Sequence, residues 1–149
     1  MRMTSLLLSI VLTSISLNAL AADMLTVADV EKITGIAGIH AAPKDQAKGA
    51  GGELNFENGE NKLVAMVMIQ DASMFDFWKK QYGKLADPVS NVGSEAFQTK
   101  PKSAIPYVFF KKTNKAIWIQ SMGWNKKGGN NVSDAQLLEL AKLAASRPE

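Results

Sequence analysis

The sequence predicts an α+β domain: an antiparallel sheet of about five strands with helices packed on it, in the order α-ββ-α-βββ-α. Three observations predict this class. Segments with the apolar spacing of helices alternate with segments whose apolar residues recur at every second position. Consecutive strand segments are joined by short turns, which pair neighbouring strands antiparallel. A serine or threonine precedes each helical segment at the position of a cap.

Length and composition narrow the possibilities further. The chain has 149 residues, which suits one domain, and its 46% hydrophobic and 21% charged residues exclude disorder, collagen-like repeats and a polytopic membrane protein. It has no cysteine, which excludes disulfides, zinc–thiolate sites and thiol nucleophiles. A single histidine excludes a multi-histidine metal site. The net charge of +3 is too small to demand an anionic partner.

Residues 1–21 have the order of a secretory signal peptide. Arg2 precedes an apolar run over 6–20, and Ala19-Leu20-Ala21 supplies the small residues of a cleavage site. A membrane anchor or a buried helix is the alternative, but the run is shorter than the ~20 apolar residues of a membrane span. We predict cleavage after Ala21 and export to the bacterial periplasm or the medium. The single α+β domain would then occupy residues 22–149, with no stable membrane insertion.

Three helices are predicted from their first turns. Each begins with a cap residue and a partner three positions later: Thr26 with Asp29, Ser73 with Asp76, and Ser133 with Gln136. Gly35 and Gly83 are predicted to end the first two helices. The last helix has an apolar stripe at helical spacing, which predicts its buried face: Leu137, Leu140, Ala141 and Ala144.

Five strands are predicted between these helices. Asn58-Gly59 predicts a hairpin turn, since both residues tolerate positive φ. Thr113-Asn114 predicts the turn of a second hairpin. The segment 35–52 holds glycines, a proline and lysines and is predicted to be a long loop. The strands are expected over residues 53–57, 62–70, 96–99, 107–112 and 115–122.

The strand over 62–70 is apolar on both faces, which indicates that both faces are covered. Simple alternation places Val64, Met66 and Met68 together on its second face. A helix, a ligand cavity or a dimer interface would each shield that face from water. Methionines form adaptable pocket walls, so Met66 and Met68 are candidate binding residues for a small apolar ligand.

A second candidate site lies in the glycine-rich segment 124–129. Trp124 would serve there as an exposed anchor for a partner or a glycan, with Lys126 and Lys127 beside it. The alternative is that Trp124 folds back to cap the sheet. Lysine doublets also occur on nucleic-acid-binding surfaces, but export argues against a nucleic-acid partner.

Residues for catalysis are scarce. His40 is the only histidine, and no serine elbow accompanies it, so we expect a surface or packing role rather than a catalytic triad. Glu53, Glu57 and Glu60 cluster near the first hairpin, but their spacing does not match a calcium-binding EF-hand loop. We therefore expect no metal and no cofactor.

The motif Asn91-Val92-Gly93-Ser94-Glu95-Ala96-Phe97, leading into a strand, resembles a segment of small exported or lipid-anchored bacterial α+β proteins. Most of those proteins are uncharacterised, and some are similar to extracellular sensor domains. The resemblance covers most of residues 25–147. It implies an exported domain used for binding, with no catalytic residues to carry over.

Two functions follow as hypotheses. The first is a non-catalytic binding module of the periplasm or cell envelope that acts through a protein partner. The alternative is a carrier or sensor of a small apolar ligand. An enzyme that uses carboxylates or lysine is the third and least favoured class, because the acidic residues fall at caps, turns and strand faces, where each has a structural role.

Overall fold

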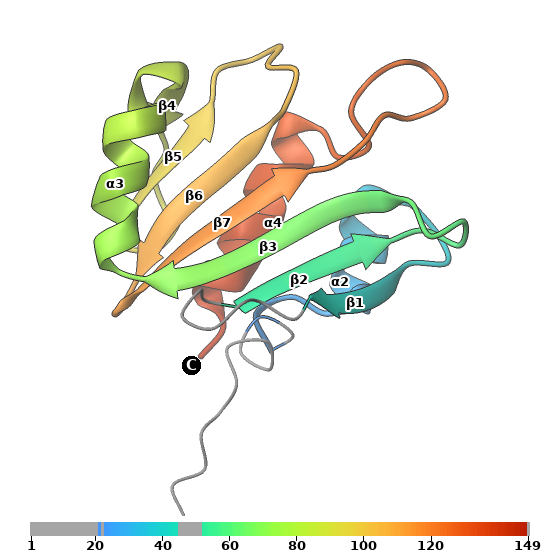
Figure 1. The fold of residues 1–149 in the computed structure, drawn as a ribbon, viewed down its shortest axis with the longest axis horizontal. Coiled ribbons are helices and arrows are strands. Elements are labelled where there is room, and N and C mark those ends of the chain that lie inside the picture. Colours follow the sequence, from blue (N-terminus) through green and yellow to red (C-terminus); the bar gives the residue numbers. More distant parts are fainter. Residues whose placement is uncertain (1–20, 22, 45–51, 149) are drawn as a thin grey trace, which may run out of the picture.

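A seven-stranded antiparallel sheet forms the middle layer of the molecule (Figure 1). The structure is a computed structural model that describes residues 21, 23–44 and 52–148. The strand order across the sheet is β1-β2-β3-β7-β6-β5-β4. The strands are β1 (His40–Lys44), β2 (Gly52–Glu57), β3 (Leu63–Asp71), β4 (Ala86–Pro88), β5 (Glu95–Thr99), β6 (Tyr107–Lys112) and β7 (Lys115–Ser121).

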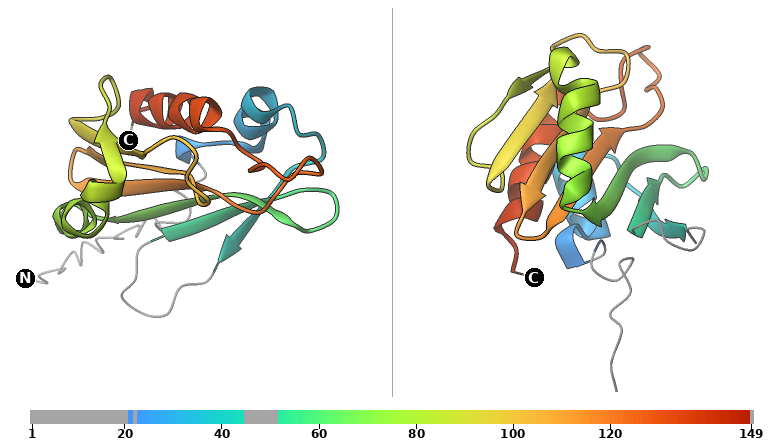
Figure 2. Two further views of the ribbon diagram at one scale, coloured as in Figure 1. Left: turned by 90° about the horizontal axis from the view of Figure 1, so that it is seen from above. Right: turned by 60° about the vertical axis from the view of Figure 1, so that its left-hand side comes forward.

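Helices cover both faces of this sheet. The helices are α2 (Val27–Thr34), α3 (Ser73–Tyr82), the short 3₁₀ helix η1 (Gly83–Leu85) and α4 (Asp134–Ser146). Helices α2 and α4 pack side by side on one face, and α3 lies on the opposite face (Figure 2). None of the helices in the described part of the chain is long and apolar enough to cross a membrane.

The α+β class and the antiparallel sheet are confirmed, but the strand number and the element order are wrong. The five predicted strands are the five central ones, and the sheet has two more, β1 and β4, at its edges. The order is therefore α-βββ-α-ββββ-α. Strand β1 lies within the segment predicted to be a loop, of which 45–51 falls outside the described residues, as do residues 1–20 of the predicted signal peptide.

The first and last helices begin as predicted. Thr26 and Asp29 form a reciprocal capping box, and so do Ser133 and Gln136. Gly35 ends α2 with a φ of 72°. The stripe of α4 is buried as expected at Leu137, Leu140, Ala141 and Ala144.

The start and end of α3 differ from the prediction. Ala72 occupies the cap position without a side-chain hydrogen bond, and Ser73 is already helical. The Ala72 N–H donates to the Asn114 carbonyl instead, because the helix leaves directly from the end of β3 beside the β6–β7 turn. Gly83 keeps a right-handed conformation, and the chain tightens there into η1.

The first hairpin is present, but its turn is longer than the predicted two residues. Strands β2 and β3 are joined by residues 58–62, and the left-handed residue is Asn61, with a φ of 57°. The Asn58 side-chain oxygen accepts hydrogen bonds from the backbone N–H groups of Glu60 and Lys62. Gly59 does not have a positive φ.

A β-bulge in β3 changes which residues share a face. Phe56 of β2 is paired with Ala65 and Glu57 with Leu63, so Val64 is the extra residue. Val64 is buried in the core beneath α2 and α4, whereas Met66 and Met68 point to the α3 face. The predicted grouping of Val64 with the two methionines is therefore wrong, because simple alternation does not hold across a bulge.

Candidate functional site

The described residues contain no group of three or more histidine, cysteine or acidic side chains placed to hold a metal ion. His40 lies on the edge strand β1, where its Nε2 is 3.2 Å from Glu57 Oε2 on the neighbouring strand β2. The distinctive chemistry of the molecule is instead aromatic.

An aromatic cluster fills the space between α3 and the sheet. Trp118 of β7 is at its centre, with its ring stacked at 4.3 Å from that of Tyr107 and at 5.5 Å from that of Phe109. Trp78 of α3 meets Trp118 edge-on at 5.4 Å. The buried aromatic residues of this cluster pack together with two buried alanines: Phe75, Trp78, Tyr107, Phe109 and Trp118, with Ala86 and Ala116.

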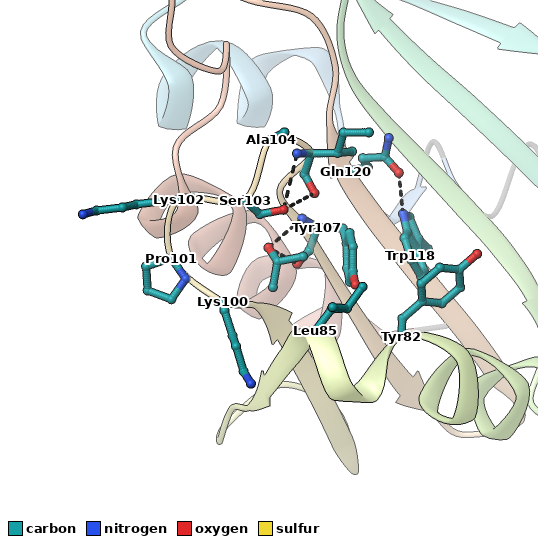
Figure 3. Close-up of a pocket in the computed structure, with 12 residues that line it drawn as sticks. Tyr82, Leu85, Lys100, Pro101, Lys102, Ser103, Ala104, Tyr107, Trp118 and Gln120 are labelled. Atoms are coloured by element: carbon teal, nitrogen blue, oxygen red, sulfur yellow. Dashed lines mark hydrogen bonds between the residues drawn. The ribbon is translucent and has the colours of Figure 1, made fainter.

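The cluster opens to the surface past the end of α3. A hollow of about 580 Å³ lies there, with aromatic rings on one side and the β5–β6 loop on the other (Figure 3). We call it the aromatic groove. Its volume is in the range of small-molecule sites. It is lined by Tyr82, Leu85, Thr99, Lys100, Pro101, Lys102, Ser103, Ala104, Ile105, Tyr107, Trp118 and Gln120.

Large apolar side chains stand exposed around the aromatic groove. Leu85 is 62% exposed and Ile105 is 56% exposed, and both line the groove. The Tyr82 ring, 38% exposed, meets the Trp118 ring edge-on at 5.1 Å. A contiguous exposed apolar surface of this kind is typical of binding sites, whereas single exposed apolar residues are ordinary.

Hydrogen bonds hold the walls of the groove in place. Thr99 Oγ1 accepts from the Tyr107 N–H and donates to the Tyr107 carbonyl, which closes the β5–β6 loop at its base. Trp118 Nε1 donates to Gln120 Oε1 at 2.9 Å, which fixes the indole ring (Figure 3). The groove is therefore preformed, so little ordering accompanies binding.

The Tyr107 hydroxyl lies at this site without a hydrogen-bond partner among the described residues. The side chain is 7% exposed. Burial, followed by the nearby Tyr82, raises the pKa of Tyr107, so the phenol stays protonated at neutral pH. A buried hydroxyl without a partner is costly, and a polar ligand atom would remove that cost only where neighbouring side chains move to expose it.

The loop side of the groove is basic. Lys100 and Lys102 line it, and its lining in the described part of the chain contains no Asp or Glu. Lys100 Nζ donates to the Lys84 carbonyl at 3.2 Å, whereas Lys102 extends outward beyond Pro101 (Figure 3). Lys102 has a φ of 66°, a left-handed conformation that is uncommon for a residue other than glycine.

A smaller hollow of about 360 Å³ extends from the groove toward Trp124. It shares Ala104, Ile105 and Gln120 with the groove. Trp124 is 63% exposed, so the alternative in which it folds back over the sheet is not observed. Its loop is held by Asn125, whose side-chain oxygen accepts from the Lys127 and Gly129 N–H groups.

The sequence-predicted site residues lie in three different surroundings. Met66 and Met68 are half-buried against the aromatic cluster and do not line the groove. Trp124 and Lys126 both line a polar cleft of about 590 Å³ on the far side of the Trp124 loop. Lys127 is exposed on the same loop and lines neither hollow.

The groove residues were missed from the sequence because they come from separate segments of the chain. The end of α3, η1, the end of β5, the β5–β6 loop, β6 and β7 all contribute side chains. One usable signal was the Tyr107–Phe109 alternation on β6 facing Trp118 on β7, which places three rings on one face.

Comparisons with known proteins find no relative. No model of a known protein family matches the chain, no curated protein matches it, and no solved structure matches it. The resemblance to small exported bacterial proteins stays a prediction.

Proposed function

We propose that the protein is a non-catalytic binding module, exported by a bacterium, that holds a small apolar ligand in the aromatic groove. The observation that carries the proposal is a preformed hollow of about 580 Å³ with three aromatic rings and two exposed aliphatic side chains around it. Rings contribute large apolar contact areas at little cost in side-chain entropy.

The Tyr107 hydroxyl is a buried polar group beside this apolar site. It is a protonated donor with no partner among the described residues, and its oxygen is itself shielded from the groove. The site as it stands is therefore lined by apolar and ring surface, with the hydroxyl accessible to a ligand acceptor only where neighbouring side chains move.

The proposal is tested with N-phenyl-1-naphthylamine, a neutral apolar dye whose emission rises on binding. We expect Leu85→Ser and Ile105→Ser each to weaken dye binding about five-fold, from a loss of about 1 kcal/mol of apolar contact. Phe77→Ser is the matched control, because Phe77 is 50% exposed but does not line the groove. Absence of binding by the wild type, or an equal loss with Phe77→Ser, would contradict the proposal.

A protein partner of the cell envelope is the second candidate. Trp124 favours it, because a 63% exposed tryptophan next to an apolar hollow is typical of an interface anchor. Cross-linking in the envelope fraction, followed by purification, tests this function. A specific partner that is recovered with the wild type and lost with Trp124→Ala supports it. Recovery that is independent of Trp124 contradicts it.

A further inference from the structure

We propose that the ligand of the aromatic groove is an anionic amphiphile: an apolar chain or ring system that ends in a carboxylate, sulfonate or phosphate. The inference rests on the proposed function and adds the charge of the ligand. The aromatic rings would hold the apolar part, and Lys100 and Lys102 would hold the anionic end.

The charge distribution within the groove carries this inference. The rings of Tyr82, Tyr107 and Trp118 lie on one side, and both lysines lie on the other (Figure 3). Among the described residues, no carboxylate lines the groove, and no ion pair joins Lys100 or Lys102 to one. An anion there meets uncompensated positive charge.

The position of the lysines suits a head group rather than a buried charge. Both side chains extend from the β5–β6 loop away from the rings, so their ammonium groups lie outside the apolar part of the groove (Figure 3). A charged group bound at the mouth stays partly hydrated, so it avoids the large cost of burying a charge. The apolar part of the same molecule can still cover Leu85 and Ile105, which are now exposed.

The backbone conformation at Lys102 allows a substitution that removes the charge without destabilising the turn. Lys102 follows Pro101 in a turn and has a φ of 66°. Proline followed by a residue with positive φ is the arrangement of a type II turn, in which glycine is the preferred second residue. Lys102→Gly therefore removes the charge while it relaxes the backbone, so a loss of binding cannot be attributed to unfolding.

Two dyes that differ only in charge test the inference. 8-Anilinonaphthalene-1-sulfonate carries a sulfonate on the ring system of N-phenyl-1-naphthylamine. We expect the wild type to bind the sulfonated dye about five-fold or more tightly at low salt, with a smaller preference at high salt. Lys102→Gly and Lys100→Gln should each reduce this preference by about two- to five-fold, the range for exposed charge pairs. Lys142→Gln on α4, remote from the groove, should leave it unchanged.

The outcomes separate the two proposals. Equal binding of both dyes by the wild type overturns the charge inference and leaves the apolar site standing, whereas binding of neither dye overturns both. A preference that survives in the Lys100 and Lys102 variants also overturns the inference. Displacement of the sulfonated dye at a lower concentration of dodecanoate than of dodecanol supports it. Binding to anionic phospholipid vesicles, without binding of either dye, shows a membrane-surface site and overturns a monomeric ligand.

Discussion

At the scale of single residues, Lys112 links the sheet to the end of α4. Its side chain is buried on β6, and its Nζ donates to the Ala144 carbonyl at 3.1 Å and to the Arg147 carbonyl. These carbonyls belong to the last turn of α4 and the residue after it, where helix carbonyls lack partners within the helix. A positive charge there also interacts favourably with the helix dipole.

We expect Lys112→Met to lower the free energy of unfolding by about 1–3 kcal/mol, because it keeps the apolar stem but leaves buried carbonyls unpaired. Urea denaturation measures the change. Lys111→Met is the control, since Lys111 precedes it on β6 and points to the opposite face. If the two substitutions lower the free energy of unfolding equally, the Lys112 hydrogen bonds contribute nothing to it.

Asp29 has a comparable role at the start of α2. Its carboxylate accepts from Thr26 and is 2.8 Å from the Arg147 guanidinium. Burial raises the pKa of Asp29, but the hydrogen bonds from Thr26 and the charge of Arg147 outweigh this effect and lower it overall. A lowered pKa in the folded state stabilises the protein at neutral pH, and that stabilisation is lost as the pH falls.

Asp29→Asn should therefore destabilise the protein by roughly 1 kcal/mol at pH 7. The difference from the wild type should shrink as the pH falls below about 4, where the carboxylate is protonated first in the unfolded state and, because its pKa is lowered, only at still lower pH in the folded state. Thermal unfolding across this range measures both effects. Glu139→Gln, at an exposed position on α4, controls for the loss of one negative charge. A difference that does not depend on pH would exclude the ionised Asp29 as its source.

At the scale of elements, the first hairpin shows which part of a turn the sequence reveals. Asn58-Gly59 correctly placed the turn, but Asn58 acts through its side chain and Asn61 adopts the left-handed conformation. Asparagine tolerates that conformation, so an asparagine three residues further along provides it as well as Gly59 would. Local composition therefore located the turn without fixing its length.

Asn61→Val should lower the melting temperature clearly, because a β-branched residue at a φ of 57° is strained by about 1 kcal/mol or more. Gly59→Val should have little effect, since a side chain there meets open space and the backbone has no positive φ. Differential scanning calorimetry of the two variants decides between Asn61 and Gly59. A larger loss with Gly59→Val would restore the two-residue turn predicted from the sequence.

The two strands that sequence analysis missed are both edges of the sheet. Strand β4 has three residues and ends at Pro88, and β1 contains Pro43. Proline cannot donate a hydrogen bond to a neighbouring strand, and edge strands tolerate it because one side remains unpaired. The five central strands have regular apolar patterns that arise from burial, so the sequence predicted them.

At the scale of the whole molecule, the binding surface depends on tertiary structure. The glycine-rich surroundings of Trp124, which are local, left open whether its ring is exposed or folds back over the sheet, and the structure shows it exposed. The aromatic groove instead needs Tyr82 at the end of α3, Ile105 in a loop and Trp118 on β7 to come together. Residue spacing along the chain does not predict that these side chains come together. Their positions depend on strand pairing between distant segments, such as that of β7 with β3 across more than 40 intervening residues.

The predicted signal peptide is tested at the same scale. Ala21 is buried, and its carbonyl accepts from the Leu25 N–H. Cleavage after Ala21 removes this hydrogen bond and the buried Ala21 side chain but retains the buried Met24 and Leu25. We expect the exported protein to begin at Ala22 and to remain folded. Intact mass of the periplasmic form measures this. A product that retains Met1, or that stays in membranes after carbonate washing, contradicts export.

The central position of β7 has a consequence for the order of assembly. Strand β3 can pair with β2 soon after both have been synthesised. The other edge of β3 stays unpaired until β7 (Lys115–Ser121) has been synthesised. Pairing over such a separation slows folding, and the open apolar edge of β3 stays available for wrong pairing meanwhile. We expect the chain to stay unfolded until strand β7 is present. Such a delay would suit the predicted export, in which the chain crosses a membrane before it folds.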